Sequence, residues 1–96
     1  LPLINFSHFG VQWHVVFFYM KDLDEKKLVS YLEKEPHTLW YKRFIGKWNY
    51  QVNIFAENNA QFHDILNKLR NSFSDNIVNF ESVIMFSQHK LADNFD

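Results

Sequence analysis

The order in which two kinds of hydrophobic period follow one another constrains the fold of this chain most. Apolar side chains at every second residue predict β-strands, and apolar side chains spaced three and four residues apart predict α-helices. The strand period occurs in four segments: Val11–Met20, Thr38–Ile45, Trp48–Ala56 and Ile77–Ser87. The helix period occurs in two: Asp24–Glu35 and Asn59–Phe73. The predicted order is therefore strand, helix, strand, strand, helix, strand (βαββαβ).

The ends of the two predicted helices carry their own signals. Asp24 is the expected N-cap of the first helix, and Pro36 ends it because proline disfavours the α conformation in the residue before it. Either Asn58 or Asn59 caps the second helix. That helix has a single apolar stripe, formed by Phe62, Ile65, Leu66, Leu69 and Phe73.

A tight turn is predicted between the two middle strands. Gly46-Lys47 suits a two-residue loop of type II′, in which glycine supplies the positive φ. In the strand after it, Phe55 is the one apolar residue opposite an apolar face formed by Trp48, Tyr50, Val52, Ile54 and Ala56. In the last strand, Val83 and Met85 lie opposite a face that we assign to Val78, Phe80, Ile84 and Phe86.

These elements predict an α+β, ferredoxin-like fold, with a four-stranded antiparallel sheet and two helices on one face. Each strand–helix–strand unit implies a right-handed crossover between parallel strands, which we expect to be neighbours in the sheet. The second face of the sheet is left without helices. Phe55, Val83 and Met85 are expected on that face, where exposed apolar side chains usually mark an association surface. We therefore predict a homodimer with a dimeric α/β-barrel-like association and an interface at these three residues.

The aromatic content also favours a second buried surface. The 96 residues include 11 Phe, 4 Tyr and 3 Trp, and a domain of this size buries a limited share of its surface internally. A compositional bias of the source, which the frequent Asn and Lys also suggest, is the alternative explanation.

Charge and motif content exclude several functions. The net charge of −1 differs from the strongly positive charge that is typical of a DNA-binding domain. The absence of Cys excludes disulfides and thiolate metal sites. The five His have no HxH or HxxxH spacing, and no phosphate loop or nucleophile elbow is present, so we predict no metal, no cofactor and no catalysis. The apolar run Val15–Met20 is far shorter than the roughly 20 residues that cross a bilayer, so no membrane contact is expected, and the absence of Cys fits the expected cytoplasmic location.

Three stretches resemble the C-terminal domain of Lrp/AsnC (feast/famine) transcriptional regulators, sometimes called the RAM domain. They are Val15–Glu25, Trp40–Tyr50, and Phe62–Phe73 with the Phe80-Glu81-Ser82 strand that follows. The family typically has Gly, any residue, an aromatic residue and then Asp at the hairpin turn. Gly46-Lys47-Trp48 match the first three positions, and Asn49 stands where the family usually has Asp.

The resemblance implies an effector-sensing and oligomerisation domain that performs no catalysis. Two such domains pair sheet against sheet, and the dimers often assemble into octamers. A small effector, frequently an amino acid, binds between subunits near the turn, which implies a site formed by Gly46, Lys47, Trp48 and Asn49. Because an amide cannot supply the negative charge that favours an ammonium group, we expect weak or no binding of ordinary amino acids.

The resemblance also implies that DNA is contacted only through a separate N-terminal helix-turn-helix domain. Residues 1–10 are then a leader or the remnant of an interdomain linker, residues 11–88 are the domain, and residues 89–96 are a tail. Two alternatives share the architecture: a stand-alone small-molecule-binding domain, and a small dimeric α/β-barrel enzyme that is a cofactorless oxygenase or handles haem. His14, expected on a partly polar strand face at a subunit interface, is the candidate haem-side histidine of the second alternative.

Overall fold

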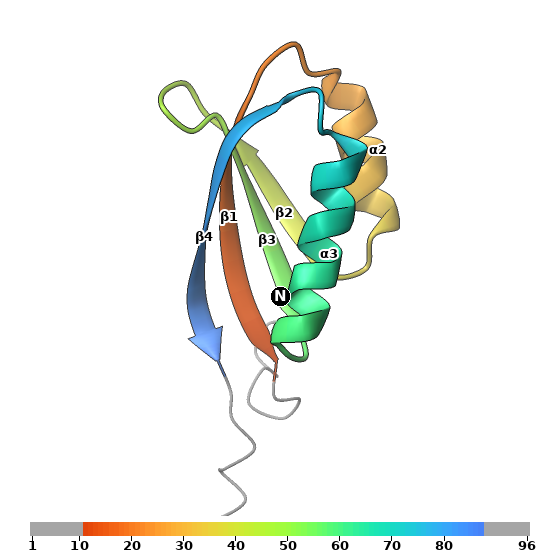
Figure 1. Ribbon diagram of the computed structural model, residues 1–96, viewed down its shortest axis with the longest axis vertical. Coiled ribbons are helices and arrows are strands. Elements are labelled where there is room, and N and C mark those ends of the chain that lie inside the picture. Colours follow the sequence, from red (N-terminus) through yellow and green to blue (C-terminus); the bar gives the residue numbers. More distant parts are fainter. Residues whose placement is uncertain (1–10, 88–96) are drawn as a thin grey trace, which may run out of the picture.

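The computed structural model describes residues 11–87, apart from the side chain of Trp40. The described chain contains β1 (Gln12–Met20), α2 (Glu25–Lys34), β2 (Thr38–Arg43), β3 (Tyr50–Ala56), α3 (Asn59–Ser72) and β4 (Ile77–Ser87) (Figure 1). This is the predicted βαββαβ order, with element ends that differ from the predicted ones by no more than two residues. The predicted leader, residues 1–10, and the predicted tail, residues 89–96, lie outside the described residues.

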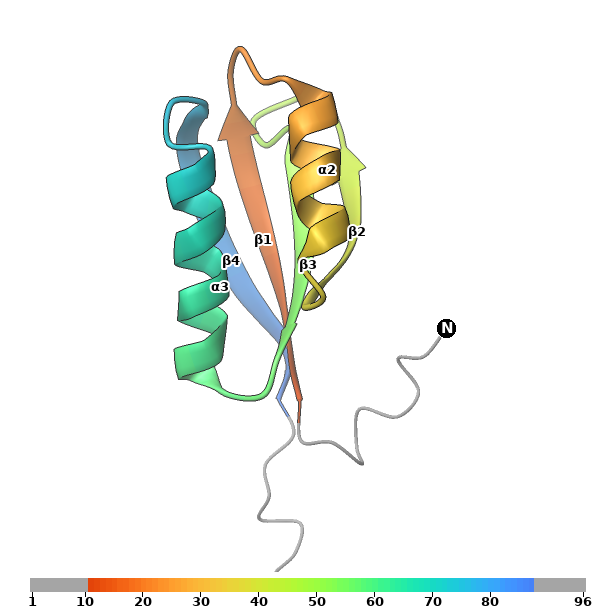
Figure 2. The same ribbon diagram turned by 90° about the vertical axis from the view of Figure 1, so that its right-hand side faces the viewer.

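The four strands form one sheet in the order β2-β3-β1-β4, and every neighbouring pair is antiparallel. Both helices lie on the same face of this sheet (Figures 1 and 2). The ferredoxin-like α+β fold is therefore confirmed. The expectation that each helix joins neighbouring parallel strands is wrong, because β3 lies between β1 and β2, and β1 lies between β3 and β4.

The core lies between the sheet and the two helices. Alternate residues of β1 and β3 point into it, including Val16, Phe18, Val52 and Ile54, all of which are fully buried. The helices, with the C-cap residue of α3, contribute a matching set of buried side chains: Leu28, Phe62, Ile65, Leu66, Leu69 and Phe73. Each fully buried Leu, Ile or Phe stabilises the fold by about 1.5–3 kcal/mol relative to leaving it exposed. The predicted apolar stripe of the second helix is thus confirmed as the core-facing side of α3.

Side-chain caps fix where the helices begin. The Asp24 carboxylate accepts a hydrogen bond from the Lys26 amide at 3.1 Å, as predicted for the N-cap of α2. Asn58 is the cap of α3, since its Oδ1 accepts from the Gln61 amide at 2.8 Å. At the other end of α2, Glu35 has extended backbone, as expected for a residue before proline.

The connection between β2 and β3 is longer than the predicted two-residue turn. β2 ends at Arg43 and β3 begins at Tyr50, so residues 44–49 form a loop, which we call the β2–β3 loop. Gly46 has a φ of +142°, the positive φ expected of it. The Phe44 amide donates to the Asn49 carbonyl at 2.8 Å, and the Asn49 amide donates to the Phe18 carbonyl of β1 at 2.9 Å, so the turn beyond this last pairing contains residues 45–48 and not Gly46 and Lys47 alone.

Two β-bulges in β4 change which residues share a face. The pairing with β1 shifts between Trp13 and His14 and again between Tyr19 and Met20. Phe86 therefore pairs with Trp13, on the face opposite Phe80, so the prediction that Phe80 and Phe86 share a face is wrong. A bulge inserts one extra residue into a strand, which reverses the alternation beyond it.

Candidate functional site

The sheet face opposite the helices, here called the helix-free face, is built from the alternate residues of β1 and from residues paired with them. Trp13, Val15, Phe17 and Tyr19 alternate with the core residues of β1. The Trp13 and Phe55 rings stack with centroids 6.0 Å apart, and the Trp13 indole donates to Asn53 Oδ1 at 2.9 Å. The β1 part of this face is therefore aromatic and apolar, and β3 adds the polar side chains of Gln51 and Asn53 beside Phe55.

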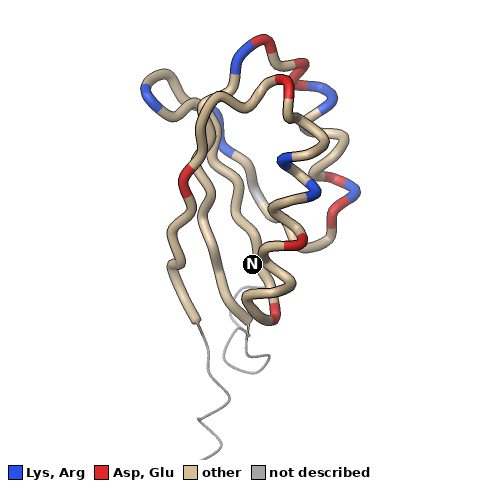
Figure 3. The backbone as a smooth tube through the Cα atoms, viewed as in Figure 1, with Lys and Arg blue, Asp and Glu red and all other residues tan. Residues whose placement is uncertain are grey.

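The three predicted interface residues lie on or beside this face. Phe55 pairs with Trp13 and is half-buried, and Val83 pairs with Val15 and is 40% exposed. Met85 lies at the bulge next to Phe86 and is 54% exposed. Glu81, the one charged residue of β4 (Figure 3), pairs with Phe17 and so adds a carboxylate to this apolar surface. The placement suits an association surface, and the interface itself stays a prediction.

A pocket lies where the β2–β3 loop meets the end of β1 and the start of β4. Gly46, Lys47 and Trp48 line it together with Tyr19, Val78 and Asn79, and its volume is about 360 Å³. We call it the loop pocket. The loop projects to the side of the sheet away from the helices (Figure 1). Tyr19 belongs to the helix-free face, so the loop pocket borders the surface predicted to contact a second copy.

Sequence reasoning found only part of this pocket. Three of the four predicted ligand-binding residues, Gly46, Lys47 and Trp48, line the loop pocket. Val78 and Asn79 were missed because their position depends on the bulge in β4, for which the sequence carries no local signal. Ligand binding in the pocket stays a prediction.

Asn49, the fourth predicted ligand-binding residue, has another role. Its Nδ2 donates to the Met20 carbonyl at 2.8 Å, and its Oδ1 accepts from the Met20 amide at 2.8 Å. The side chain thus pairs with both backbone groups of Met20, as a further residue of a neighbouring strand would. Asn49 is not among the residues that line the loop pocket. Its amide anchors the loop to β1, which gives a structural reason for the departure from the family's Asp.

His14 lies on the even-numbered, partly polar face of β1, as predicted, but this face is covered by the helices. It is 6% exposed and stacks on Phe62 of α3, with ring centroids 3.6 Å apart and an interplanar angle of 8°. Its Nε2 lies 2.8 Å from Gln12 Oε1. Its predicted place at a subunit interface is therefore wrong, because the even-numbered residues of β1 face the helices. Burial lowers the pKa of His14, and the nearby His63 lowers it further.

The lowered pKa of His14 predicts that the protein loses stability in mild acid. A base with a depressed pKa in the folded state is protonated more readily when unfolded, so the free energy of unfolding falls as pH drops below about 6.5. One such group contributes at most about 1.4 kcal/mol per pH unit. Urea unfolding at several pH values between 8 and 5.5 measures this. His14→Phe keeps a ring on Phe62 and should reduce the pH dependence; an unchanged slope would exclude His14 as its source.

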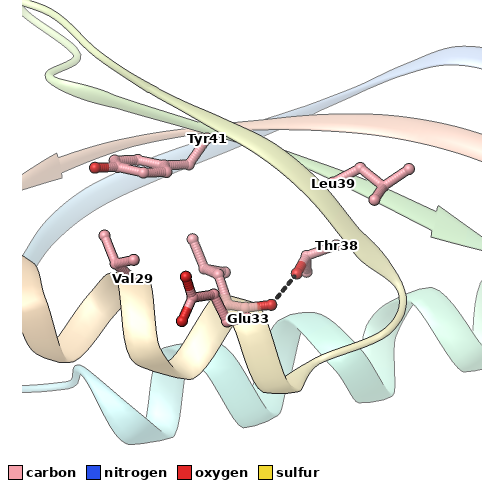
Figure 4. A pocket seen from close by; sticks show the side chains of 6 residues that line it. Val29, Glu33, Thr38, Leu39 and Tyr41 are labelled. Carbon is pink, nitrogen blue, oxygen red and sulfur yellow. Dashed lines mark hydrogen bonds between the residues drawn. The ribbon is translucent and has the colours of Figure 1, made fainter. Parts of the chain in front are cut away.

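A second, smaller pocket lies between α2 and the edge strand β2. Val29 and Glu33 of α2 face Thr38 and Tyr41 of β2 around a volume of about 250 Å³ (Figure 4). The Glu25 carboxylate accepts from the Tyr41 hydroxyl at 2.8 Å and from Arg43 Nη1 at 2.9 Å. The hydrogen bond to this carboxylate raises the pKa of Tyr41. These groups bind one another, so their arrangement is that of a contact holding β2 to α2.

Residues 11–87 were compared with the arrangements that metal binding and membrane crossing require. No group of three His, Asp or Glu side chains there is arranged to hold a metal ion. None of the described helices combines the length and the apolar character that a bilayer span requires.

Comparison with known proteins places the chain by its fold. No family model and no curated protein matches its sequence. Among solved structures, a transcriptional regulator from Neisseria meningitidis in complex with L-Met superposes with a TM-score of 0.69 at 13% identity, over 94% of this chain and 58% of the regulator. An AsnC family transcriptional regulator from Agrobacterium tumefaciens gives 0.67 at 15% identity, over the same shares of the two chains.

A third match has a different length. A Dabb family protein with a ferredoxin-like fold from Mesorhizobium loti gives a TM-score of 0.57 at 14% identity, over 83% of this chain and 99% of that protein. The chain therefore spans somewhat more than half of the regulators but nearly all of the Dabb protein. At these identities the matches establish a shared ferredoxin-like fold, found both in Lrp/AsnC regulators and in Dabb proteins.

Proposed function

We propose that the chain is the effector-sensing and oligomerisation domain of an Lrp/AsnC-type transcriptional regulator and performs no catalysis. The observation that carries the proposal is the position of the loop pocket beside the helix-free face. A ligand held by Lys47 and Trp48 would lie next to the surface on which we expect a second copy to pack. The fold shared with two transcriptional regulators, each matched over 58% of its length, supports the same assignment.

The proposed mechanism couples the pocket to assembly. A ligand shifts an assembly equilibrium only by as much as its affinity differs between the two assembly states. The β2–β3 loop provides such a difference if a second copy changes the space around Trp48. A homodimer, or an octamer of four dimers, would then hold the DNA-binding domains at a ligand-dependent spacing. DNA contact in this scheme belongs to a helix-turn-helix domain outside these 96 residues.

This assignment predicts that the chain alone does not bind duplex DNA appreciably at physiological salt. Its net charge is −1, and DNA affinity without base recognition comes mainly from Lys and Arg that neutralise phosphates. A mobility-shift or fluorescence-anisotropy titration with random and palindromic duplexes measures it. Submicromolar binding by these 96 residues would contradict the proposed division of labour.

A small dimeric α/β-barrel enzyme is the second candidate, favoured by the match to a Dabb protein that consists of one such domain. His14 gives it little support as a haem-side histidine, because α3 covers the ring and Phe62 stacks on it. Anaerobic and aerobic mass spectrometry of candidate substrates incubated with the chain distinguishes turnover from binding. A stand-alone small-molecule-binding domain shares the proposed pocket and differs only in lacking a DNA-binding partner domain.

A further inference from the structure

The loop pocket presents hydrogen-bond donors and positive charge. Lys47 lines it, and Lys21, at the end of β1, places its ammonium 5.9 Å from the ring centroid of Tyr19, another lining residue. Asn79 Oδ1 already accepts from the Phe80 amide at 2.9 Å, so Asn79 offers a ligand its Nδ2 donors. The lining residues in the described part of the chain include no carboxylate.

The groups that would receive a ligand's ammonium are already used by the protein. Carboxylates and the faces of aromatic rings bind an ammonium more strongly than neutral oxygen acceptors do. The Lys47 ammonium lies over the Trp48 ring, 5.4 Å from its centroid, and Lys21 occupies the corresponding place at Tyr19. A ligand with its own ammonium would have to displace a lysine from a ring and then remain beside that lysine.

A ligand carboxylate, unlike an ammonium, finds groups in the pocket that can bind it. It can pair with the Lys47 ammonium and accept a hydrogen bond from Asn79 Nδ2. The side chains of Tyr19, Trp48 and Val78 supply flat and apolar walls, which suit a ring. A volume of about 360 Å³ is that of a small-molecule pocket.

We propose that the loop pocket takes an aromatic monoanion, a flat ring that carries a carboxylate directly or through one carbon, and discriminates against zwitterionic amino acids. The proposal rests on the proposed effector role of this pocket and specifies the ligand's charge. Its selectivity comes from Lys47, which lines the pocket and can pair with a ligand carboxylate, and Lys21 beside Tyr19 adds to the positive charge that repels a ligand ammonium.

Three probes with the same ring and different charge test this proposal. Indole-3-acetate is an anion at pH 7, L-tryptophan a zwitterion and tryptamine a cation. Isothermal titration calorimetry on the full chain should show indole-3-acetate binding at least tenfold more tightly than tryptophan, and tryptamine more weakly still. Lys47→Gln should weaken indole-3-acetate binding at least fivefold. Lys26→Gln, on an exposed turn of α2 outside the pocket lining, should leave it unchanged.

Each contrary result overturns a defined part of the proposal. Tryptophan binding as tightly as indole-3-acetate, or Lys47→Gln without effect, would overturn the charge selectivity. Failure of all three probes at millimolar concentration would overturn the assignment of an aromatic ligand. Sedimentation velocity on the same samples measures the oligomeric state separately from ligand binding. A stable oligomer that binds no probe leaves the assembly role standing, whereas a monomer that binds indole-3-acetate contradicts the assembly role alone.

Discussion

The Asn49→Asp variant is expected to be less stable than the unmodified protein by about 1–3 kcal/mol at neutral pH, the usual cost of leaving a partly buried polar group without its partner. The Asp carboxylate can still accept from the Met20 amide, but it cannot donate to the Met20 carbonyl. It would place a negative charge against that carbonyl oxygen, where the native Nδ2 lies 2.8 Å away. Urea unfolding followed by circular dichroism gives the difference directly.

The pH dependence of that difference identifies its cause. A protonated carboxyl group has one donor and one acceptor, as the native amide does, so folding should raise the pKa of the introduced Asp. The penalty is therefore present above that pKa and should shrink as pH falls through it. Comparing variant and unmodified protein at each pH cancels the contribution of His14. Asn67→Asp, on the exposed side of α3, is the control and should cost little. An equal loss in both variants would contradict the anchoring role of Asn49.

The second large effect is expected at the helix-free face. Val83→Glu should raise the dissociation constant of the dimer at least about 100-fold, or about 2.7 kcal/mol, because the two-fold pairing would bury two unpaired carboxylates. Ile84→Glu is the matched control. Ile84 is 49% exposed and pairs with His14, on the helix side of the same strand. The Ile84→Glu variant should therefore leave the dissociation constant of the dimer nearly unchanged.

Both substitutions add the same charge to neighbouring residues of β4, so general effects on solubility or net charge should be alike. The free energy of unfolding of each variant separates loss of assembly from loss of fold. Equal weakening by both variants would indicate that assembly uses the edge of β4 instead of the helix-free face. No weakening by Val83→Glu would remove Val83 from the interface.

Local periodicity was enough to predict the elements, their order and most of the core. The residues predicted to face the core are buried there in the structure. They include the stripe from Phe62 to Phe73 and the alternating residues Val52, Ile54 and Ala56. The Asp24 cap was likewise predictable, because its hydrogen bond reaches only two residues along the chain. These features depend on interactions between residues that are close in sequence.

The features that could not be predicted depend on pairing between distant strands. The role of Asn49 requires Met20, 29 residues away, and no pattern around the turn indicates that partner. The bulges that place Phe86 and Val78 arise from the register of β4 against β1. His14 was expected at a subunit interface because its face of β1 is partly polar, whereas Phe62 of α3 and Gln12 provide a stacking surface and a hydrogen bond within one chain. The candidate site was consequently only half predictable.

Sedimentation equilibrium of the unmodified 96-residue chain tests the central claim most directly. The account predicts a mass of at least twice the 11.7 kDa of one chain at tens of micromolar, because the helix-free face is expected to bury the roughly 1,200–2,000 Å² typical of a specific interface. A mass that stays at 11.7 kDa over this concentration range would contradict it.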